Sequence, residues 1–179
     1  LSAFTDDDSV LKEALDECAR YEKLFSRTVS GSDVWRINEE SGPVDVSAET
    51  VKMLTTGLDV SEASGGAFDP TIEPESSLWD FSGETTVLPD AEKLKEAAGR
   101  VDYRRLVVDG NTVTLPDDMG LDLGGVAKGY IADRLTEFLR DRGIASALIN
   151  LGGNVVTIGR RATDDQPWVV GIQDPKAES

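Results

Sequence analysis

A glycine-rich segment before an expected helix has the residue types that bind phosphate. Residues 122–130 read Asp-Leu-Gly-Gly-Val-Ala-Lys-Gly-Tyr. A helix N-terminus exposes backbone N–H groups and the positive end of the helix dipole, and glycine lets an anion approach the main chain closely. Lys128 would add a cation one turn into the helix. The pattern is neither a Walker A loop nor a dinucleotide fingerprint, and a tight strand-to-helix turn is the alternative explanation of the glycines.

Two further segments combine glycines with a polar side chain. In residues 64–71, Ser-Gly-Gly-Ala-Phe-Asp-Pro-Thr, Asp69 lies between an aromatic residue and a proline in a stiff loop. Such a carboxylate accepts from a ribose or an adenine amine, binds a metal ion, or stabilises its own turn. Residues 150–154, Asn-Leu-Gly-Gly-Asn, end an expected strand, where glycines mark a tight turn or a bulge. Neither segment by itself distinguishes a ligand site from turn chemistry.

The composition excludes several kinds of site. The 179 residues contain no histidine, which excludes a Ser-His-Asp triad, an imidazole general base and a histidine-ligated zinc within them. The single cysteine, Cys18, excludes an internal disulfide, and its helical spacing from Leu11 and Leu15 predicts a place in the core. A net charge of −16 disfavours nucleic acid and anionic lipid as partners. No run approaches the roughly 20 apolar residues of a transmembrane helix.

Apolar residues at spacings of three and four predict the helices that must position these segments. The expected helices are 9–25, 48–63, a short one from after Asp90 to near Gly99, and about 126–142. Ser47 is the expected N-cap of the second helix, and Gly57 inside it weakens that prediction. Gly143 is expected to end the last helix.

Short apolar runs between turn residues predict the strands. The expected strands are a hairpin over 106–115, a short strand at Leu121 and Leu123, and strands at 145–151, 155–158 and 168–172. Asp109-Gly110 predicts a type I′ turn in the hairpin. Paired strands with interspersed helices, and no linker or internal repeat, predict an α+β fold in a single domain over residues 1–179.

Taken together and in this order, the segments resemble the ApbE family of FAD:protein FMN transferases. The matching blocks are residues 64–71, 78–81 (Leu-Trp-Asp-Phe), 122–130 and 150–154, and also 32–38, which ends in Arg-x-Asn. Turn chemistry alone does not fix the order of such blocks. The resemblance covers almost the whole chain. It implies an ApbE-like α+β fold with a mixed or antiparallel sheet and packed helices. It also implies Mg²⁺-dependent transfer of FMN from FAD to a threonine of an acceptor protein, with release of AMP.

The resemblance also implies roles for individual residues. It assigns these residues to the FAD site: Ala67, Phe68, Asp69, Asp122 and Lys128. Lys128 would lie near the pyrophosphate of FAD. The backbone carbonyl of Gly125 would be a ligand of Mg²⁺, a hard cation that takes oxygen ligands. The metal would draw charge from the pyrophosphate as the P–O bond to AMP breaks.

The chain departs from the family's pattern in three places. The family normally continues well beyond Ser179, in a part that carries the remaining metal ligands, an Asp and a Thr, and a histidine-containing motif. The catalytic residues are therefore expected there, and the isolated chain is expected to be inactive. Thr28 stands about where the family often has a tyrosine that stacks on the flavin. The family's first strand is expected to precede Leu1.

Three alternatives to the transferase stay open. Water in place of the threonine hydroxyl would make the protein an FAD pyrophosphatase that gives FMN and AMP. The second alternative is a non-catalytic flavin-binding lipoprotein, and the third is a structural fragment without a ligand. The resemblance suggests an exported, often lipid-anchored protein outside the cytoplasmic membrane, and a start at Leu1 is consistent with a lost leader. The expected acceptor is a subunit of a membrane redox complex or an exported flavoprotein.

Overall fold

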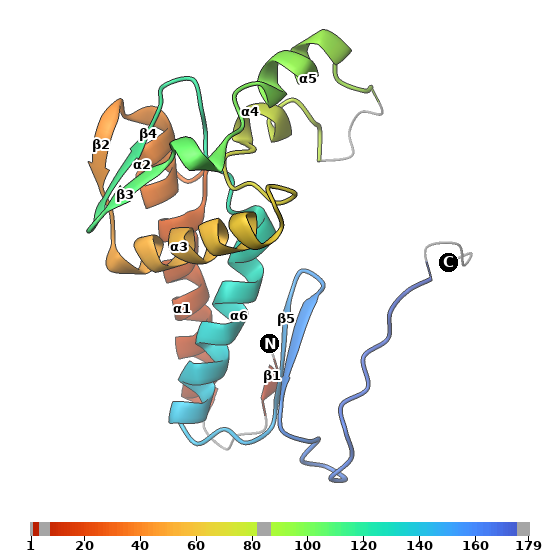
Figure 1. Ribbon diagram of the computed structural model, residues 1–179. Helices are drawn as coiled ribbons and strands as arrows, with labels where there is room; N and C mark the ends of the chain where they lie inside the picture. The colour runs from red at the N-terminus through yellow and green to blue at the C-terminus, as the bar shows by residue number, and fades with distance from the viewer. Residues whose placement is uncertain (1, 4–7, 82–86, 175–179) are drawn as a thin grey trace. The chain divides into compact units, whose positions relative to one another are not determined.

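Contacts within the chain divide it into two compact units, each described here by itself. The computed structural model describes residues 2–3, 8–81 and 87–174 (Figure 1). Unit 1 comprises residues 1–18 and 128–179, and unit 2 comprises residues 19–127. The divisions fall inside two helices, α1 (Asp8–Phe25) and α6 (Gly124–Asp141). Each unit combines helices with an antiparallel sheet, which confirms the α+β fold class. The single domain over residues 1–179 stays a prediction.

In unit 1 a three-stranded antiparallel sheet packs with parts of α1 and α6. Its strands are β1 (Ser2–Ala3), β5 (Ala147–Leu151) and β6 (Asn154–Ile158), in the order β1-β5-β6. The turn of the β5–β6 hairpin is Gly152-Gly153, and both residues have positive φ, +59° and +92°. A type I′ turn needs this left-handed backbone at both central positions, which glycine adopts without strain. The core comprises Val10, Ala14, Leu135, Leu139, Ile144, Ala147, Ile149 and Ile158.

The buried face of α1 differs from the predicted one. Val10 and Ala14, four residues apart, are buried, whereas Leu15 is 58% exposed. Because Leu15 directly follows Ala14, it points about 100° away from the buried stripe. Cys18 packs against the core but is only partly buried, and this partial burial raises the pKa of its thiol. The prediction that Cys18 is a core residue is therefore confirmed only in part.

Helix α6 begins close to its predicted start and ends at the predicted glycine. It begins at Gly124, two residues before the predicted start. At its end Gly143 has φ +78°, its N–H donates to Arg140 O (2.9 Å), and the Ile144 N–H donates to Leu139 O (3.0 Å). This pair of bonds is a Schellman motif and confirms Gly143 as the end of the helix.

The predicted strand over residues 168–172 is wrong. These residues form no strand, and no described strand pairs with them. Val169 and Ile172 are 81% and 96% exposed, and the Trp168 ring N–H donates to Ile158 O (3.2 Å). An apolar run predicts only that a segment favours burial, while a strand also needs a partner for its backbone.

Among the described helices, none combines the length and the apolar character needed to cross a bilayer.

Unit 2 has a three-stranded antiparallel sheet and several short helices. Its elements are α2 (Asp33–Glu39), β2 (Gly42–Asp45), α3 (Ala48–Ala63), α4 (Glu73–Ser76), α5 (Ala91–Ala98), the 3₁₀ turn η1 (Tyr103–Arg105), β3 (Val107–Asp109) and β4 (Thr112–Leu115). The strand order is β2-β4-β3. Asp90 caps α5 and Gly99 follows it, as predicted. Helix α3 packs on the 68–70 loop, and Phe68 and Asp69 of this loop line the pocket described below.

The hairpin of unit 2 has the predicted strands but a different turn. Asp109 pairs with Thr112, so the two turn residues are Gly110 and Asn111. Gly110 has φ +58°, while Asn111 is not among the described residues with positive φ. A type I′ turn needs positive φ at both positions, and glycine at the first position alone is the type II′ pattern. The predicted type I′ turn at Asp109-Gly110 is therefore wrong in type and by one residue in position.

The predicted helix over residues 48–63 is confirmed in its bounds and its cap. The Thr50 N–H donates to Ser47 Oγ (3.1 Å). Gly57, which weakened the prediction, lies on the buried face of the helix. A Cβ added to Gly57 would lie 3.8 Å from Pro70 and 3.9 Å from Phe68. The absence of a side chain at Gly57 therefore lets the 68–70 loop pack closely on α3.

A buried carboxylate fastens the start of α3 to α2. Asp33 Oδ2 accepts from Thr50 Oγ1 (2.6 Å) and from the Ser47 N–H (2.9 Å), and Thr50 is fully buried. We expect Thr50→Val to lower the free energy of unfolding by about 1–3 kcal/mol, because it leaves a buried carboxylate with one donor fewer. Urea unfolding measures this loss. Thr56→Val, on the exposed face of α3, is the matched control and should change stability by less than about 0.5 kcal/mol. Equal stability of the two variants would contradict the prediction.

Candidate functional site

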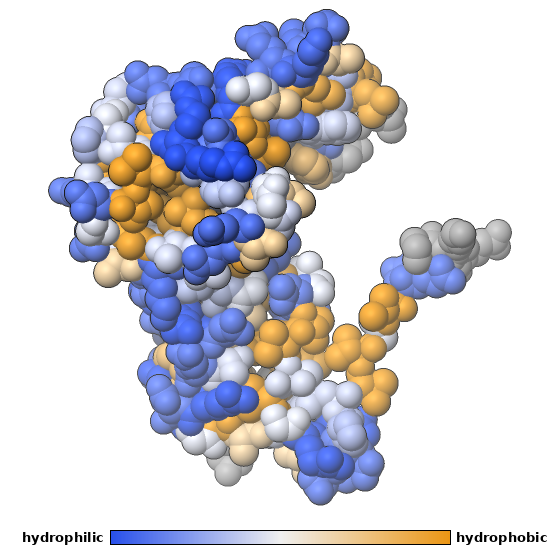
Figure 2. Space-filling model, in the orientation of Figure 1, coloured by the Kyte–Doolittle hydropathy of each residue, from blue (hydrophilic) through white to orange (hydrophobic). Residues whose placement is uncertain are grey.

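Unit 2 contains a pocket of about 880 Å³ that is lined by the segments singled out from the sequence. Its lining residues are 65–69, 72, 75–76, 81, 98–99, 101–104, 122 and 124–125. Five of the predicted site residues line it: Ala67, Phe68, Asp69, Asp122 and Gly125. Apolar side chains are exposed over the part of unit 2 that follows α4 and precedes α5 (Figure 2), including Trp79, Phe81 and Leu88. The pocket thus combines acidic, glycine and aromatic walls.

Asp69 joins two walls of the pocket. Its Oδ1 accepts from the Thr71 N–H (2.8 Å) and from Thr71 Oγ1 (2.7 Å), and its Oδ2 accepts from the Tyr103 N–H (2.8 Å). Thr71 Oγ1 in turn accepts from the Asp102 N–H (3.0 Å). The carboxylate therefore stabilises its own turn, as the simpler sequence interpretation proposed, and it also holds the η1 segment at the pocket.

Phe68 and Gly125 lie against each other in the pocket. A Cβ built on Gly125 would lie 2.8 Å from Cε2 of the Phe68 ring. That distance is far below normal carbon–carbon contact, which is about 3.5–4.0 Å. Glycine at position 125 is therefore required for the ring of Phe68 to occupy its place over the first turn of α6.

Asp122 fixes the start of α6. Its Oδ1 accepts from the Gly124 N–H (2.9 Å), and its Oδ2 accepts from Ser76 Oγ (3.1 Å). A carboxylate at a helix N-terminus satisfies an otherwise unpaired N–H and interacts favourably with the helix dipole. The Asp122 N–H donates to Pro70 O (2.8 Å), which ties this segment to the 64–71 loop.

Leu121 and Leu123, predicted as a short strand, form no strand although both are buried. The neighbouring pairing is a single bridge between Ile72 and Gly120. The side chain of Asn38 takes the place of a strand partner. Its Oδ1 accepts from the Leu121 N–H (2.7 Å), and its Nδ2 donates to Leu121 O (3.0 Å). The asparagine of the Arg-x-Asn block thus holds the backbone next to Asp122.

We expect Asn38→Ala to lower the free energy of unfolding by about 2–3 kcal/mol, because it leaves both backbone groups of buried Leu121 without their partner. Chemical denaturation of the variant and the parent protein measures the loss. Asn111→Ala is the control, since Asn111 is an exposed turn residue, and it should cost less than about 0.5 kcal/mol. A cost at Asn38 no greater than at Asn111 would show that the side-chain bonds to Leu121 contribute nothing.

Lys128, the sixth predicted residue, belongs to unit 1 and is not among the residues that line the pocket. It is exposed in the first turns of α6. Its Nζ lies 3.7 Å from the position of a Cβ on Gly152, in the turn of the β5–β6 hairpin. The Asn150 side chain accepts from the Gly153 N–H (2.8 Å) and stabilises that turn. The structure therefore brings Lys128 to the 150–154 block.

The described residues supply only part of a metal site. Within residues 2–3, 8–81 and 87–174, no group of three or more Asp, Glu, Cys or His side chains is arranged to hold a metal ion. Gly125 offers a single carbonyl oxygen, and the oxygens of Asp122 already accept hydrogen bonds. Mg²⁺ usually takes one or two carboxylates together with water and substrate phosphate. The described residues alone therefore do not constitute a complete magnesium site.

Sequence reasoning missed several residues that shape the pocket: Arg27, Ser76, Asp102 and Tyr103. Arg27 forms an ion pair with Asp122 (3.2 Å), and the Tyr103 N–H binds Asp69. None of them stands beside a glycine pair, the pattern that indicates the other segments. Thr28, the position at which the family often has a tyrosine, is exposed, and its hydroxyl lies 3.1 Å from Ser26 Oγ.

The fold and the pocket define an α+β protein with a pocket built around glycine turns and the start of a helix. The model of the ApbE family matches residues 2–179, so the chain belongs to the ApbE family. It is 33% identical over 184 residues to the FAD:protein FMN transferase of Treponema pallidum (strain Nichols), with 93% of this chain and 51% of that protein covered. It is 31% identical to the FAD:protein FMN transferase of Klebsiella pneumoniae (strain 342), with 100% and 56% covered.

Solved structures show the same similarity. The ApbE protein of Thermotoga maritima superposes with a TM-score of 0.86 at 30% identity, over 100% of this chain and 60% of that one. The flavin transferase ApbE from Vibrio cholerae gives a TM-score of 0.84 at 25% identity, over 98% of this chain and 58% of that one. The chain spans about half the length of the curated relatives that it matches.

Proposed function

We propose that the complete protein is an FAD:protein FMN transferase and that the pocket of unit 2 is part of its FAD site. The observation that carries the proposal is that residues 65–69 and residues 122, 124 and 125, far apart in the sequence, line one pocket of unit 2. Relatives that the chain matches over 93% and 100% of its length bear the name FAD:protein FMN transferase. In this proposal Ala67, Phe68 and Asp122 contact FAD, while Asp69 shapes the loop between them.

The proposed reaction moves the FMN half of FAD onto a threonine. The threonine hydroxyl gives its proton to the solvent, and its oxygen forms a bond to the phosphorus of the FMN half. The bond from that phosphorus to the bridging oxygen breaks, and AMP leaves with the electron pair. Phosphoryl transfer of this kind depends mainly on positioning and on neutralising charge. The first turn of α6 suits the positioning role, because its backbone N–H groups and dipole favour an anion.

Magnesium is part of this proposal. When bound, Mg²⁺ would stabilise the charge that develops on the pyrophosphate. Gly125 would supply one carbonyl ligand, and the other ligands would come from phosphate oxygens, water and residues beyond those described. We further propose that the protein acts outside the cytoplasmic membrane, attached by a lipid anchor, on a subunit of a membrane redox complex or an exported flavoprotein. These last proposals rest on the family resemblance.

The test is to incubate the complete protein with FAD, Mg²⁺ and candidate acceptor proteins, and to follow both AMP release and the mass of the acceptor. An acceptor that gains FMN on a threonine supports the transferase. Release of free FMN and AMP without an acceptor adduct would instead identify an FAD pyrophosphatase. Binding of FAD without any AMP release would identify a flavin-binding protein, for which the exposed Thr28 at the usual tyrosine position is the favouring observation. Absence of FAD binding would overturn the proposal.

A further inference from the structure

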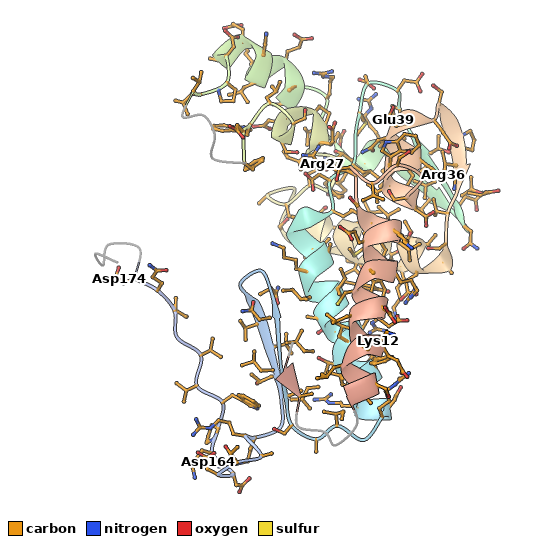
Figure 3. The ribbon with its side chains drawn as sticks, turned by 180° about the vertical axis from the view of Figure 1, so that it is seen from behind. Lys12, Arg27, Arg36, Glu39, Asp164 and Asp174 are labelled. Atoms are coloured by element: carbon orange, nitrogen blue, oxygen red, sulfur yellow. The ribbon has the colours of Figure 1, made fainter. Side chains whose placement is uncertain are left out.

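Arg27 bridges two segments at the pocket although it does not line the pocket itself. It lies in the segment between α1 and α2 (Figure 3), and its side chain is 31% exposed. Its Nε lies 3.2 Å from Asp122 Oδ2, and its Nη1 lies 3.6 Å from Glu73 Oε1. Asp122 lines the pocket, and Glu73 opens the short helix α4. The guanidinium of Arg27 therefore ties the segment before α6 to α4.

The same ion pair fixes the orientation of the Asp122 carboxylate. Oδ2 lies between Arg27 Nε and Ser76 Oγ, which leaves Oδ1 turned to the Gly124 N–H at the start of α6. The planar guanidinium presents donors in a fixed fork, so it can hold two carboxylates in one geometry. Loss of the Arg27 guanidinium would leave Asp122 Oδ2 with the Ser76 hydroxyl as its donor. The Asp122 carboxylate would then be free to rotate away from Gly124.

The positive charge of Arg27 also reduces the negative charge at the pocket. Four carboxylates line the pocket, those of Asp69, Glu75, Asp102 and Asp122, and Arg104 is the basic residue among the lining residues. Arg104 itself is paired with Asp102 (3.3 Å). A pyrophosphate that enters this pocket meets predominantly negative groups. Arg27 offsets the charge of Asp122, the carboxylate closest in sequence to the first turn of α6.

We propose that Arg27 is a positioning residue of the FAD site. It holds Asp122 against the start of α6 and offsets its charge, so that the pyrophosphate of FAD can approach the Gly124-Gly125 backbone. The inference rests on the proposed function, since it names FAD as the occupant of the pocket. Arg27 acts through Asp122 and need not touch the ligand.

The test compares Arg27→Met with the wild type in the complete protein, by fluorescence titration with FAD and with riboflavin, which has no phosphate. We expect FAD to bind the variant about tenfold more weakly, the effect of one unit charge at close range. Riboflavin should bind both proteins equally. The loss for FAD should shrink at high salt, because ions screen a partly exposed charge. The FAD affinity of Arg27→Lys, which keeps the charge but lacks the planar guanidinium, should lie between those of the wild type and Arg27→Met.

The matched control is Arg20→Met, which removes an arginine of α1 that pairs with Glu49 (3.2 Å), away from the residues that line the pocket. It should leave FAD affinity unchanged. Unchanged FAD affinity in Arg27→Met, or an equal loss of FAD and riboflavin affinity, would overturn the inference.

A ligand-free measurement separates failure of this inference from failure of the proposed function. A wild-type protein that binds no FAD would overturn the proposed function and the role of FAD in this inference. A double-mutant cycle of Arg27→Met and Asp122→Asn on chemical unfolding tests the ion pair without any ligand. Coupling between the two substitutions supports Arg27 as the residue that holds Asp122, and additive effects would overturn that role.

Discussion

Lys128→Ala in the complete protein should reduce FMN transfer by about a hundredfold or more while the fold stays intact. The resemblance to the ApbE family implies that the Lys128 ammonium lies near the pyrophosphate of FAD, where it would stabilise the negative charge that develops as AMP leaves. Removal of one positioned donor or charge from such a site typically costs this much in rate. Lys128 is exposed on α6, and alanine is a better helix former than lysine, so stability should not fall.

The measurement is the initial rate of AMP release and acceptor modification, with thermal unfolding as the check on the fold. Lys12→Ala is the matched control, because Lys12 is an exposed lysine of α1 in the same unit (Figure 3). Its rate should equal that of the wild type. Wild-type transfer by Lys128→Ala would remove Lys128 from the mechanism and leave its contact with the Gly152 turn as a structural feature.

Gly125→Val should weaken FAD binding about tenfold to a hundredfold. The added Cβ would lie 2.8 Å from the Phe68 ring, so the ring must leave its position over the first turn of α6. Overpacking of this kind costs about 1–3 kcal/mol, which corresponds to the stated range of affinity when the displaced ring belongs to the binding site.

Gly129→Val is a control for Gly125→Val on the same helix. A Cβ at Gly129 meets no atom within 4 Å, and valine is tolerated in a helix better than glycine. FAD titration and thermal unfolding of both variants decide the outcome. We expect Gly129→Val to bind FAD as the wild type does. Equal FAD affinity of the two variants would mean that the contact of Phe68 with Gly125 has no part in the ligand site.

The sequence by itself determined the local features of this protein. The sequence pattern predicted the helices over residues 48–63 and 91–98, and Gly143 predicted the end of α6, because helix periodicity and capping depend on near neighbours. The order of the glycine blocks was also sufficient to recognise the ApbE family, which the match over residues 2–179 confirms.

The tertiary structure alone decided what depends on distant partners. Residues 121–123 and 168–172 have the composition of strands, yet the first pairs with the Asn38 side chain and the second with no described strand. Leu15 is exposed because the packing of α1 selects the face that carries Val10 and Ala14. The link from Arg27 to Asp122 spans 95 positions of sequence and leaves no local pattern. Such contacts are fixed by how the chain packs, because a side chain's partner across the fold depends on geometry that no short segment encodes.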